Sequence, residues 1–195
     1  MTKYILAGGR VHVAPDNGKA FINELIKGFS HKPVKILVCL FAVPKEQWQE
    51  KFNGDQEYFS KFISDFELEL ADENIFTKQV KRSDVIFLRG GHTRPLMDLL
   101  TKNIDWLQEL NGKVFAGTSA GAEAISKYYF VTKTNRNGEG LGLLPIKFIP
   151  HWKSTYFDDE PQNIDWDKLY SDFKNYKEDL ELIVLKEGEF KVIER

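Results

Sequence analysis

The sequence is poor in the features that mark secreted and membrane proteins. It has 195 residues and a single cysteine, Cys39, so no disulfide can form within the chain. No apolar run reaches the roughly 18 residues that a membrane-spanning helix needs. The apolar run near the first residue is too short for a signal peptide. These absences predict a cytoplasmic protein with no membrane partner.

The charge balance and the spacing of the histidines argue against two further classes of protein, those that bind nucleic acid and those that bind a metal ion. The 27 lysines and arginines are offset by 29 aspartates and glutamates, which leaves a net charge of −2. A nucleic-acid-binding protein usually carries a concentrated basic patch, so no nucleic-acid partner is expected. The four histidines form no H-x-x-x-H or H-E-x-x-H motif, and a C-x-x-C motif is absent. We therefore expect no metal site.

The pattern of apolar residues predicts one α/β domain spanning residues 1–195. Apolar runs typical of buried parallel strands alternate with segments of helical spacing. The expected strands are 4–7, 34–43, 66–70, 84–89, 114–116, 128–131, 180–185 and 190–193. The expected helical segments are 19–29, 45–66, 75–82, 94–100, 104–110, 122–126 and 164–176. Residues 135–140 are rich in turn formers and are expected to form a loop.

The segment Lys-Val-Phe-Ala-Gly-Thr-Ser-Ala-Gly at 113–121 contains the pattern G-x-S-x-G around Ser119. A short apolar run precedes it and a helix-like segment follows, which is the context that a nucleophile elbow requires. In such a turn the serine lies on strained backbone, and Gly117 and Gly121 allow the turn to close. The pattern predicts Ser119 as a nucleophile, against the alternative of an ordinary glycine-rich turn.

A nucleophilic serine needs a general base within hydrogen-bonding distance. His151 is the first candidate, because it follows an apolar run and Pro150, where a strand is expected to end at the edge that carries Ser119. His92 is the second candidate and could instead contact the substrate. The two other histidines are expected at the surface; they are His12 and His31.

The base in turn needs an acceptor that fixes its tautomer. Glu187 is slightly favoured, since it lies on a tight turn between two expected strands. The other candidate acids are Glu189, Asp158, Asp159 and Glu123.

Two further glycine pairs follow expected strands, at 8–9 and at 90–91. In an open parallel sheet, ligands bind outside the carboxyl ends of the strands. The turn at 90–91 is therefore expected to face the same cleft as Ser119. The pair at 8–9 is expected to let the backbone approach that cleft closely.

Three segments together are similar to a known family. They are Phe-Leu-Arg-Gly-Gly-His-Thr at 87–93, Gly-Thr-Ser-Ala-Gly-Ala at 117–122, and Gly-Leu-Gly-Leu-Leu-Pro at 140–145 followed by Pro150 and His151. In this combination the chain resembles the peptidase E (aspartyl dipeptidase) and cyanophycinase family of serine peptidases, over about residues 34–187. The resemblance implies the class I glutamine amidotransferase-like fold, a three-layer α/β sandwich with a mostly parallel, flavodoxin-like sheet.

The resemblance also implies roles for individual residues. It makes Ser119 the nucleophile and His151 the general base, and the turn at 186–188 makes Glu187 the third member of the triad. The oxyanion donors would be the backbone N–H of Ala120 and one N–H from Gly90–Gly91.

The chain departs from the family pattern in two places. His92 stands where the family usually has asparagine. The arginine-bearing segment that the family carries after the catalytic histidine is not recognisable in residues 152–160, where Lys153 could pair with a carboxylate instead.

The resemblance implies a hydrolase that cleaves short peptides, including dipeptides with N-terminal aspartate, as a monomer or homodimer and without a cofactor. The alternatives are an esterase or amidase acting on a small acyl substrate, and a non-catalytic ligand-binding protein of the same fold.

Overall fold

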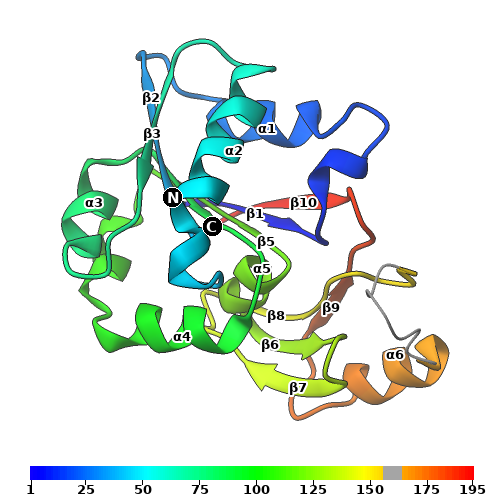
Figure 1. The fold of residues 1–195 in the computed structure, drawn as a ribbon. Helices are drawn as coiled ribbons and strands as arrows, with labels where there is room; N and C mark the ends of the chain where they lie inside the picture. The colour runs from blue at the N-terminus through cyan, green and yellow to red at the C-terminus, as the bar shows by residue number, and fades with distance from the viewer. Residues whose placement is uncertain (156–163) are drawn as a thin grey trace.

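The computed structural model describes residues 1–155 and 164–195 (Figure 1). Six strands form the main sheet, and they are β1 (Lys3–Ala7), β2 (Val34–Cys39), β3 (Phe66–Leu70), β4 (Val85–Leu88), β5 (Val114–Thr118) and β10 (Phe190–Glu194). Their order is β10-β1-β5-β4-β2-β3. All neighbours are parallel except β1 and β10. The carboxyl ends of the five parallel strands therefore share one edge.

A second, four-stranded sheet lies beside the first. Its strands are β6 (Ser126–Val131), β7 (Arg136–Glu139), β8 (Leu144–Ile149) and β9 (Glu181–Val184), in the order β7-β6-β8-β9. β8 is parallel to both β6 and β9, whereas β7 is antiparallel to β6. The helices are α1 (Lys19–Ile26), α2 (Trp48–Ser60), α3 (Phe76–Arg82), α4 (Thr93–Lys102), α5 (Ala120–Ile125) and α6 (Trp166–Lys174). Three short 3₁₀ helices are η1 (Val11–Val13), η2 (Lys45–Gln47) and η3 (Asp105–Glu109).

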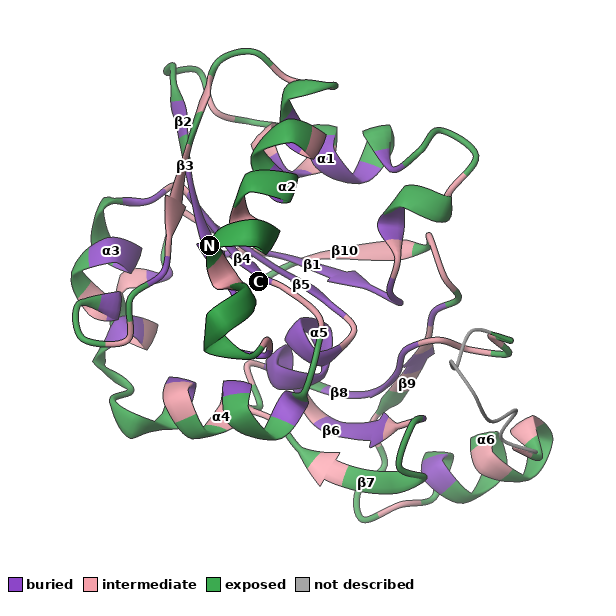
Figure 2. Cartoon of the chain, in the orientation of Figure 1, coloured by how far each residue is buried: buried purple, intermediate pink, exposed green. Residues whose placement is uncertain are grey.

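Successive side chains along the strands of the main sheet point to opposite faces, and they pack into two apolar cores. On one face, α1 and α2 contribute Phe21 and Phe59 to an apolar cluster that also contains Phe87 of β4. On the other face, α3, α4, α5 and the second sheet enclose a cluster around Phe115 of β5. Figure 2 shows the resulting burial of the central strands and of α5. The predicted fold class, a three-layer α/β sandwich with a mostly parallel sheet, is confirmed.

The outer face of the second sheet is covered by α6. Phe130 and Ile149 of the sheet pack against Phe173 of this helix. Lys147 of β8 is fully buried, and its ammonium group donates to the carbonyl of Lys174 at the end of α6, 2.5 Å away. The negative end of the helix dipole also stabilises a cation at this position.

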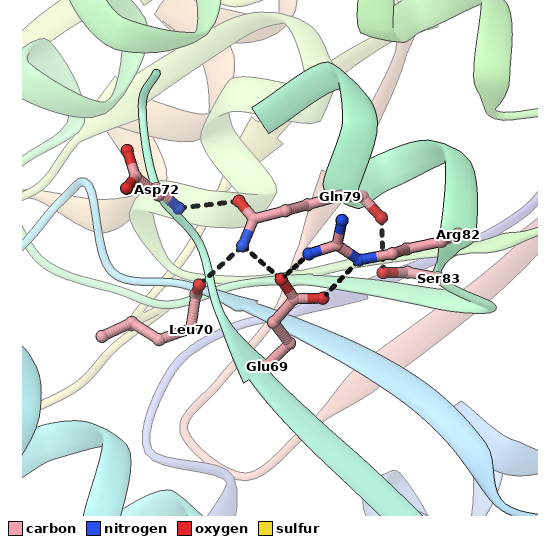
Figure 3. A network of polar contacts seen from close by, with 6 residues as sticks. All are labelled: Glu69, Leu70, Asp72, Gln79, Arg82 and Ser83. Atoms are coloured by element: carbon pink, nitrogen blue, oxygen red, sulfur yellow. Dashed lines mark hydrogen bonds and ion pairs between the residues drawn. The ribbon is translucent and has the colours of Figure 1, made fainter. Parts of the chain in front are cut away.

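The edge strand β3 is joined to α3 by a polar network (Figure 3). The Gln79 side-chain amide donates to Glu69 (2.6 Å) and to the carbonyl of Leu70 (2.9 Å), and it accepts from the backbone N–H of Asp72. Arg82 makes two hydrogen bonds to the Glu69 carboxylate. This network holds α3 against the carboxyl end of the edge strand.

The structure corrects the expected secondary structure at 135–140. Residues 135–140 were expected as a loop, which is wrong, because 136–139 form β7. Gly138 is paired with Tyr129 and lies against its ring, so pairing with β6 overrides the turn-forming composition. The helix α2 continues through Asn53 and Gly54 without a break. The two last strands, β9 and β10, belong to different sheets.

Within the described ranges, no helix combines the length and the apolarity that crossing a bilayer requires.

Candidate active site

Ser119 occupies a sharp turn between β5 and α5. Its backbone has φ 49° and ψ −113°, a region that non-glycine residues rarely adopt. A Cβ at Gly117 would lie 2.3 Å from the carbonyl carbon of Gly121, and a Cβ at Gly121 would lie 2.2 Å from the oxygen of Leu88. Both glycines are therefore required by close backbone packing. The strand–turn–helix geometry expected for this segment is present.

His151 reaches Ser119 from the second sheet. It follows the end of β8, and its backbone N–H donates to the carbonyl of Gly8 (2.9 Å), just beyond β1. The next N–H, of Trp152, donates to the carbonyl of Leu185 after β9 (3.0 Å). These bonds join the ends of three strands at one point. They bring the imidazole Nε2 of His151 to 2.7 Å from the Oγ of Ser119.

Glu187 holds the other side of the imidazole ring. Its Oε1 lies 2.7 Å from the Nδ1 of His151 and also accepts a hydrogen bond from the hydroxyl of Ser154 (3.0 Å). A neutral ring that donates from Nδ1 to this carboxylate leaves Nε2 to accept from the Ser119 hydroxyl. Gly9 packs against the pair, since a Cβ there would lie 2.3 Å from the ring. The structure thus joins three predicted residues in one hydrogen-bonded chain.

The other candidate acids occupy different positions. Glu189 accepts a hydrogen bond from the backbone N–H of Lys186 (2.8 Å). Glu123 is buried and hydrogen-bonded to Thr93. Asp158 and Asp159 lie outside the described residues. Glu187 is the described candidate that the structure places against the ring.

The turn after β4 lies beside the elbow. The backbone N–H groups of its two glycines differ in their hydrogen bonding. The N–H of Gly90 already donates to the side-chain oxygen of Thr118 (3.0 Å). The N–H groups of Gly91 and Ala120 make no hydrogen bond to any described residue. Of the two glycines, Gly91 is therefore the one with an available donor.

The remaining histidines and the cysteine take no part in the hydrogen bonds that link Ser119, His151 and Glu187. His92 precedes α4 and lines a pocket together with Phe41, Trp48, Pro95 and Leu99. His12 and His31 are exposed, as predicted. Cys39 is fully buried, and burial raises the pKa of its thiol to about 12, so it stays protonated and unreactive.

Residues 1–155 and 164–195 contain no group of three or more His, Cys, Asp or Glu side chains placed to hold a metal ion.

A charged pair next to the glycine turn was missed from the sequence. The Nε of Arg89 lies 3.3 Å from Oδ2 of Asp55, which is only 3% exposed. Burial raises the pKa of Asp55, while the Arg89 guanidinium opposes that shift. The position of Arg89 directly before Gly90 is a signal that could have been noticed. Asp55 could not be distinguished, because the charges of 45–66 look like a solvated helix face.

If the Gly91 N–H is an oxyanion donor, replacing Gly91 with alanine is expected to lower kcat for a cleaved substrate by roughly 10²–10³-fold, the usual cost of losing one such donor. Gly91 has φ 151°, and an added Cβ would lie 2.3 Å from the carbonyl oxygen of Ala42, so the turn must shift. Steady-state kinetics would measure the change. The control is Gly54→Ala in α2, where an added methyl group meets no atom within 4 Å. A kcat for Gly91→Ala equal to that of the control would contradict this role.

A serine on an elbow, hydrogen-bonded through histidine to a carboxylate, is the arrangement found in serine hydrolases. The model of peptidase family S51 matches residues 6–194. The chain therefore belongs to peptidase family S51, and it is a peptidase. The similarity to the peptidase E family noted in the sequence is confirmed.

Two solved structures have a similar fold. A peptidase from an acI-B1 Actinobacterium has a TM-score of 0.71 and 19% sequence identity, and the match covers 99% of this chain and 83% of that one. A proposed peptidase E protein from Listeria monocytogenes EGD-e has a TM-score of 0.66 and 17% identity, with coverage of 99% and 97%. A comparison with curated proteins found no significant match.

Proposed function

We propose that this peptidase hydrolyses short peptides by an acyl-enzyme mechanism. Ser119 attacks the peptide carbonyl while His151 takes its proton and then passes it to the leaving amine. Glu187 holds the ring and stabilises the imidazolium. The N–H groups of Ala120 and Gly91 donate to the oxyanion, and water then releases the acyl group from the serine.

The hydrogen-bonded chain from Ser119 to Glu187 carries this proposal. Both of its links, Oγ to Nε2 and Nδ1 to Oε1, are 2.7 Å long, within the range of good hydrogen bonds. A protein that only binds a ligand has no need of a serine on strained backbone aligned with a histidine and a carboxylate. Strain of this kind costs about 1–3 kcal/mol and persists where function requires it.

We also propose that the substrates include dipeptides with N-terminal aspartate, which need a cation near the nucleophile. Lys153 is a poor candidate, because an ammonium group lacks the planar fork with which a guanidinium binds a carboxylate. Arg89 is better placed. It directly precedes Gly90, where an added Cβ would lie 3.4 Å from the Cβ of Ser119.

The ion pair with Asp55 suits Arg89 for this role. The two side chains are closest at Nε of Arg89. The two terminal nitrogens of an arginine are among the donors with which it binds a carboxylate in fork geometry. The buried carboxylate of Asp55 would hold the guanidinium in a fixed orientation.

The experiment compares Asp-Leu with Asn-Leu, two dipeptides of nearly the same shape that differ in charge. We expect the wild-type enzyme to prefer Asp-Leu. Arg89→Gln is expected to lower kcat/KM for Asp-Leu by roughly 10–100-fold, the value of hydrogen bonds to a charged group, and to leave Asn-Leu nearly unchanged.

The matched control is Arg82→Gln, which removes another arginine–carboxylate pair at the far edge of the sheet (Figure 3). Equal losses on both dipeptides would contradict a role for Arg89 in recognition but leave the peptidase mechanism intact. If the wild-type protein cleaved no dipeptide but hydrolysed p-nitrophenyl acetate, the esterase alternative would replace the dipeptidase proposal. If it hydrolysed neither, the ligand-binding alternative would stand.

A further inference from the structure

A buried carboxyl group lies directly behind the nucleophile and is not used by the proposed mechanism. Glu123 belongs to the first turn of α5, and its backbone N–H donates to the carbonyl of Ser119 (2.8 Å). Its side chain is turned away from solvent, and the residue is 3% exposed. The carboxyl Oε2 accepts a hydrogen bond from the hydroxyl of Thr93. The helix that carries the elbow is thereby bonded to α4.

Thr93 ends the glycine turn that carries the available N–H of Gly91. Two other bonds hold this turn: Gly90 donates to the side chain of Thr118 in β5, and His92 donates its N–H to the carbonyl of Ala42 in the turn after β2 (2.7 Å). The bond from Thr93 to Glu123 attaches the same turn to the helix that begins immediately after Ser119. The distance between the two proposed oxyanion donors, which lie on the turn and on α5, therefore depends on this bond.

The surroundings of Glu123 are almost entirely apolar. The strands β1, β4, β5 and β8 that pack against α5 contribute apolar side chains to one cluster. The polar groups that face Glu123 are Thr93 from α4 and Tyr129 from β6. Burial raises the pKa of Glu123 to about 7, opposed by the hydrogen bond from Thr93. Burial, assisted by Glu123, raises the pKa of Tyr129 to about 12, so the phenol stays neutral.

We propose that Glu123 is a positioning residue that, through Thr93, holds the Gly91 N–H in register with Ser119. The proposal rests on the peptidase mechanism above, in which this N–H donates to the oxyanion. A donor that matters only when the oxyanion forms affects kcat rather than substrate binding. The protonated carboxyl is the active form, since a carboxylate on the elbow helix would disfavour the negative charge of the oxyanion.

The test combines Thr93→Val with Glu123→Gln. The valine variant keeps the shape of threonine but loses the hydroxyl, and we expect kcat to fall by roughly 5–10-fold, the value of one hydrogen bond, with KM within about twofold of wild type. The glutamine variant can still accept the bond from Thr93, so its kcat at pH 6 is expected to stay close to wild type.

The dependence of kcat on pH is a second measurement, and it would not change if Glu123 contributed only to the stability of the fold. Wild-type kcat is expected to decline as the pH rises past about 7, where Glu123 ionises. This decline should be absent in Glu123→Gln, which stays neutral. Ser126→Ala is the matched control, because its hydroxyl bonds to the backbone carbonyl of Glu123 (2.8 Å) and leaves the contact with Thr93 intact.

The outcomes separate this proposal from the one on which it rests. An inactive wild-type protein would overturn both. An active protein in which Thr93→Val lowers the melting temperature but not kcat would overturn the positioning role alone. An alkaline decline that persists in Glu123→Gln would contradict the requirement for a neutral carboxyl group. Should Thr93→Val fail to fold, Thr93→Ser, which keeps the hydroxyl, is compared with Thr93→Ala, which lacks it, and equal kcat values in the two would overturn the positioning role.

Discussion

Replacing Ser119 with alanine is expected to lower kcat/KM for a cleaved dipeptide by about 10⁴–10⁶-fold, the range seen when the nucleophile of a serine hydrolase is removed. Alanine has no oxygen that could attack the carbonyl, whereas binding of the peptide would be retained. The Oγ of Ser119 is the atom that lies 2.7 Å from the base. The measurement is the rate of dipeptide hydrolysis at enzyme concentrations high enough to detect residual turnover.

Ser126→Ala is a suitable control for this substitution, because Ser126 directly follows the helix that Ser119 precedes, and it is fully buried. It should retain activity within a few-fold of wild type, as expected for one hydrogen bond away from the reacting atoms. Activity of Ser119→Ala within tenfold of the control would show that the nucleophile has been assigned to the wrong residue.

Replacing Glu187 with glutamine is expected to lower kcat by about 10⁴-fold while the fold is preserved. The carboxylate accepts a hydrogen bond from the Nδ1–H of His151, 2.7 Å away. An amide that presents its NH₂ group to the ring would instead favour the tautomer with hydrogen on Nε2, and Nε2 could then no longer accept from Ser119. The measurement is kcat over a range of pH, with circular dichroism to confirm folding.

Glu189→Gln is the matched control for Glu187→Gln, because both residues lie in the segment between β9 and β10. Glu189 accepts from the backbone N–H of Lys186 and is expected to be dispensable for turnover. If Glu187→Gln were active and a variant of Asp158 or Asp159 were not, the third member of the triad would have to be reassigned.

The elbow could be predicted from the sequence because its determinants are local. The glycines at 117 and 121, the preceding apolar run and the following helix lie within about a dozen residues. Each of them constrains the backbone of that segment directly, through close packing or through the start of a helix. The structure accordingly has the turn where the pattern predicts it.

The partners of Ser119 were harder to rank because they are brought together by tertiary structure. His151 follows β8 of a second sheet, which the sequence pattern did not distinguish from the first. The candidate acids were chemically equivalent in the sequence, and only the placement of Glu187 against the ring separates it from Glu189 and Glu123. A turn between strands gives no information about which side chain faces which neighbour.

Residues whose importance comes from burial could not be recognised at all. Glu123 and Asp55 are each 3% exposed, yet both occupy helical segments in which an acid normally faces water. Their burial follows from the packing of α5 under the second sheet and of α2 over Arg89. Helical periodicity alone predicts neither contact, because it describes one helix and not the surface against which the helix packs.

The most direct test of the account is reaction of the protein with a fluorophosphonate probe, followed by intact-mass measurement and peptide mapping. We predict one adduct, located on Ser119, that forms much more slowly in His151→Ala and is absent in Ser119→Ala. The absence of an adduct in the folded wild-type protein, or an adduct on another residue, would contradict the claim that Ser119 is an activated nucleophile.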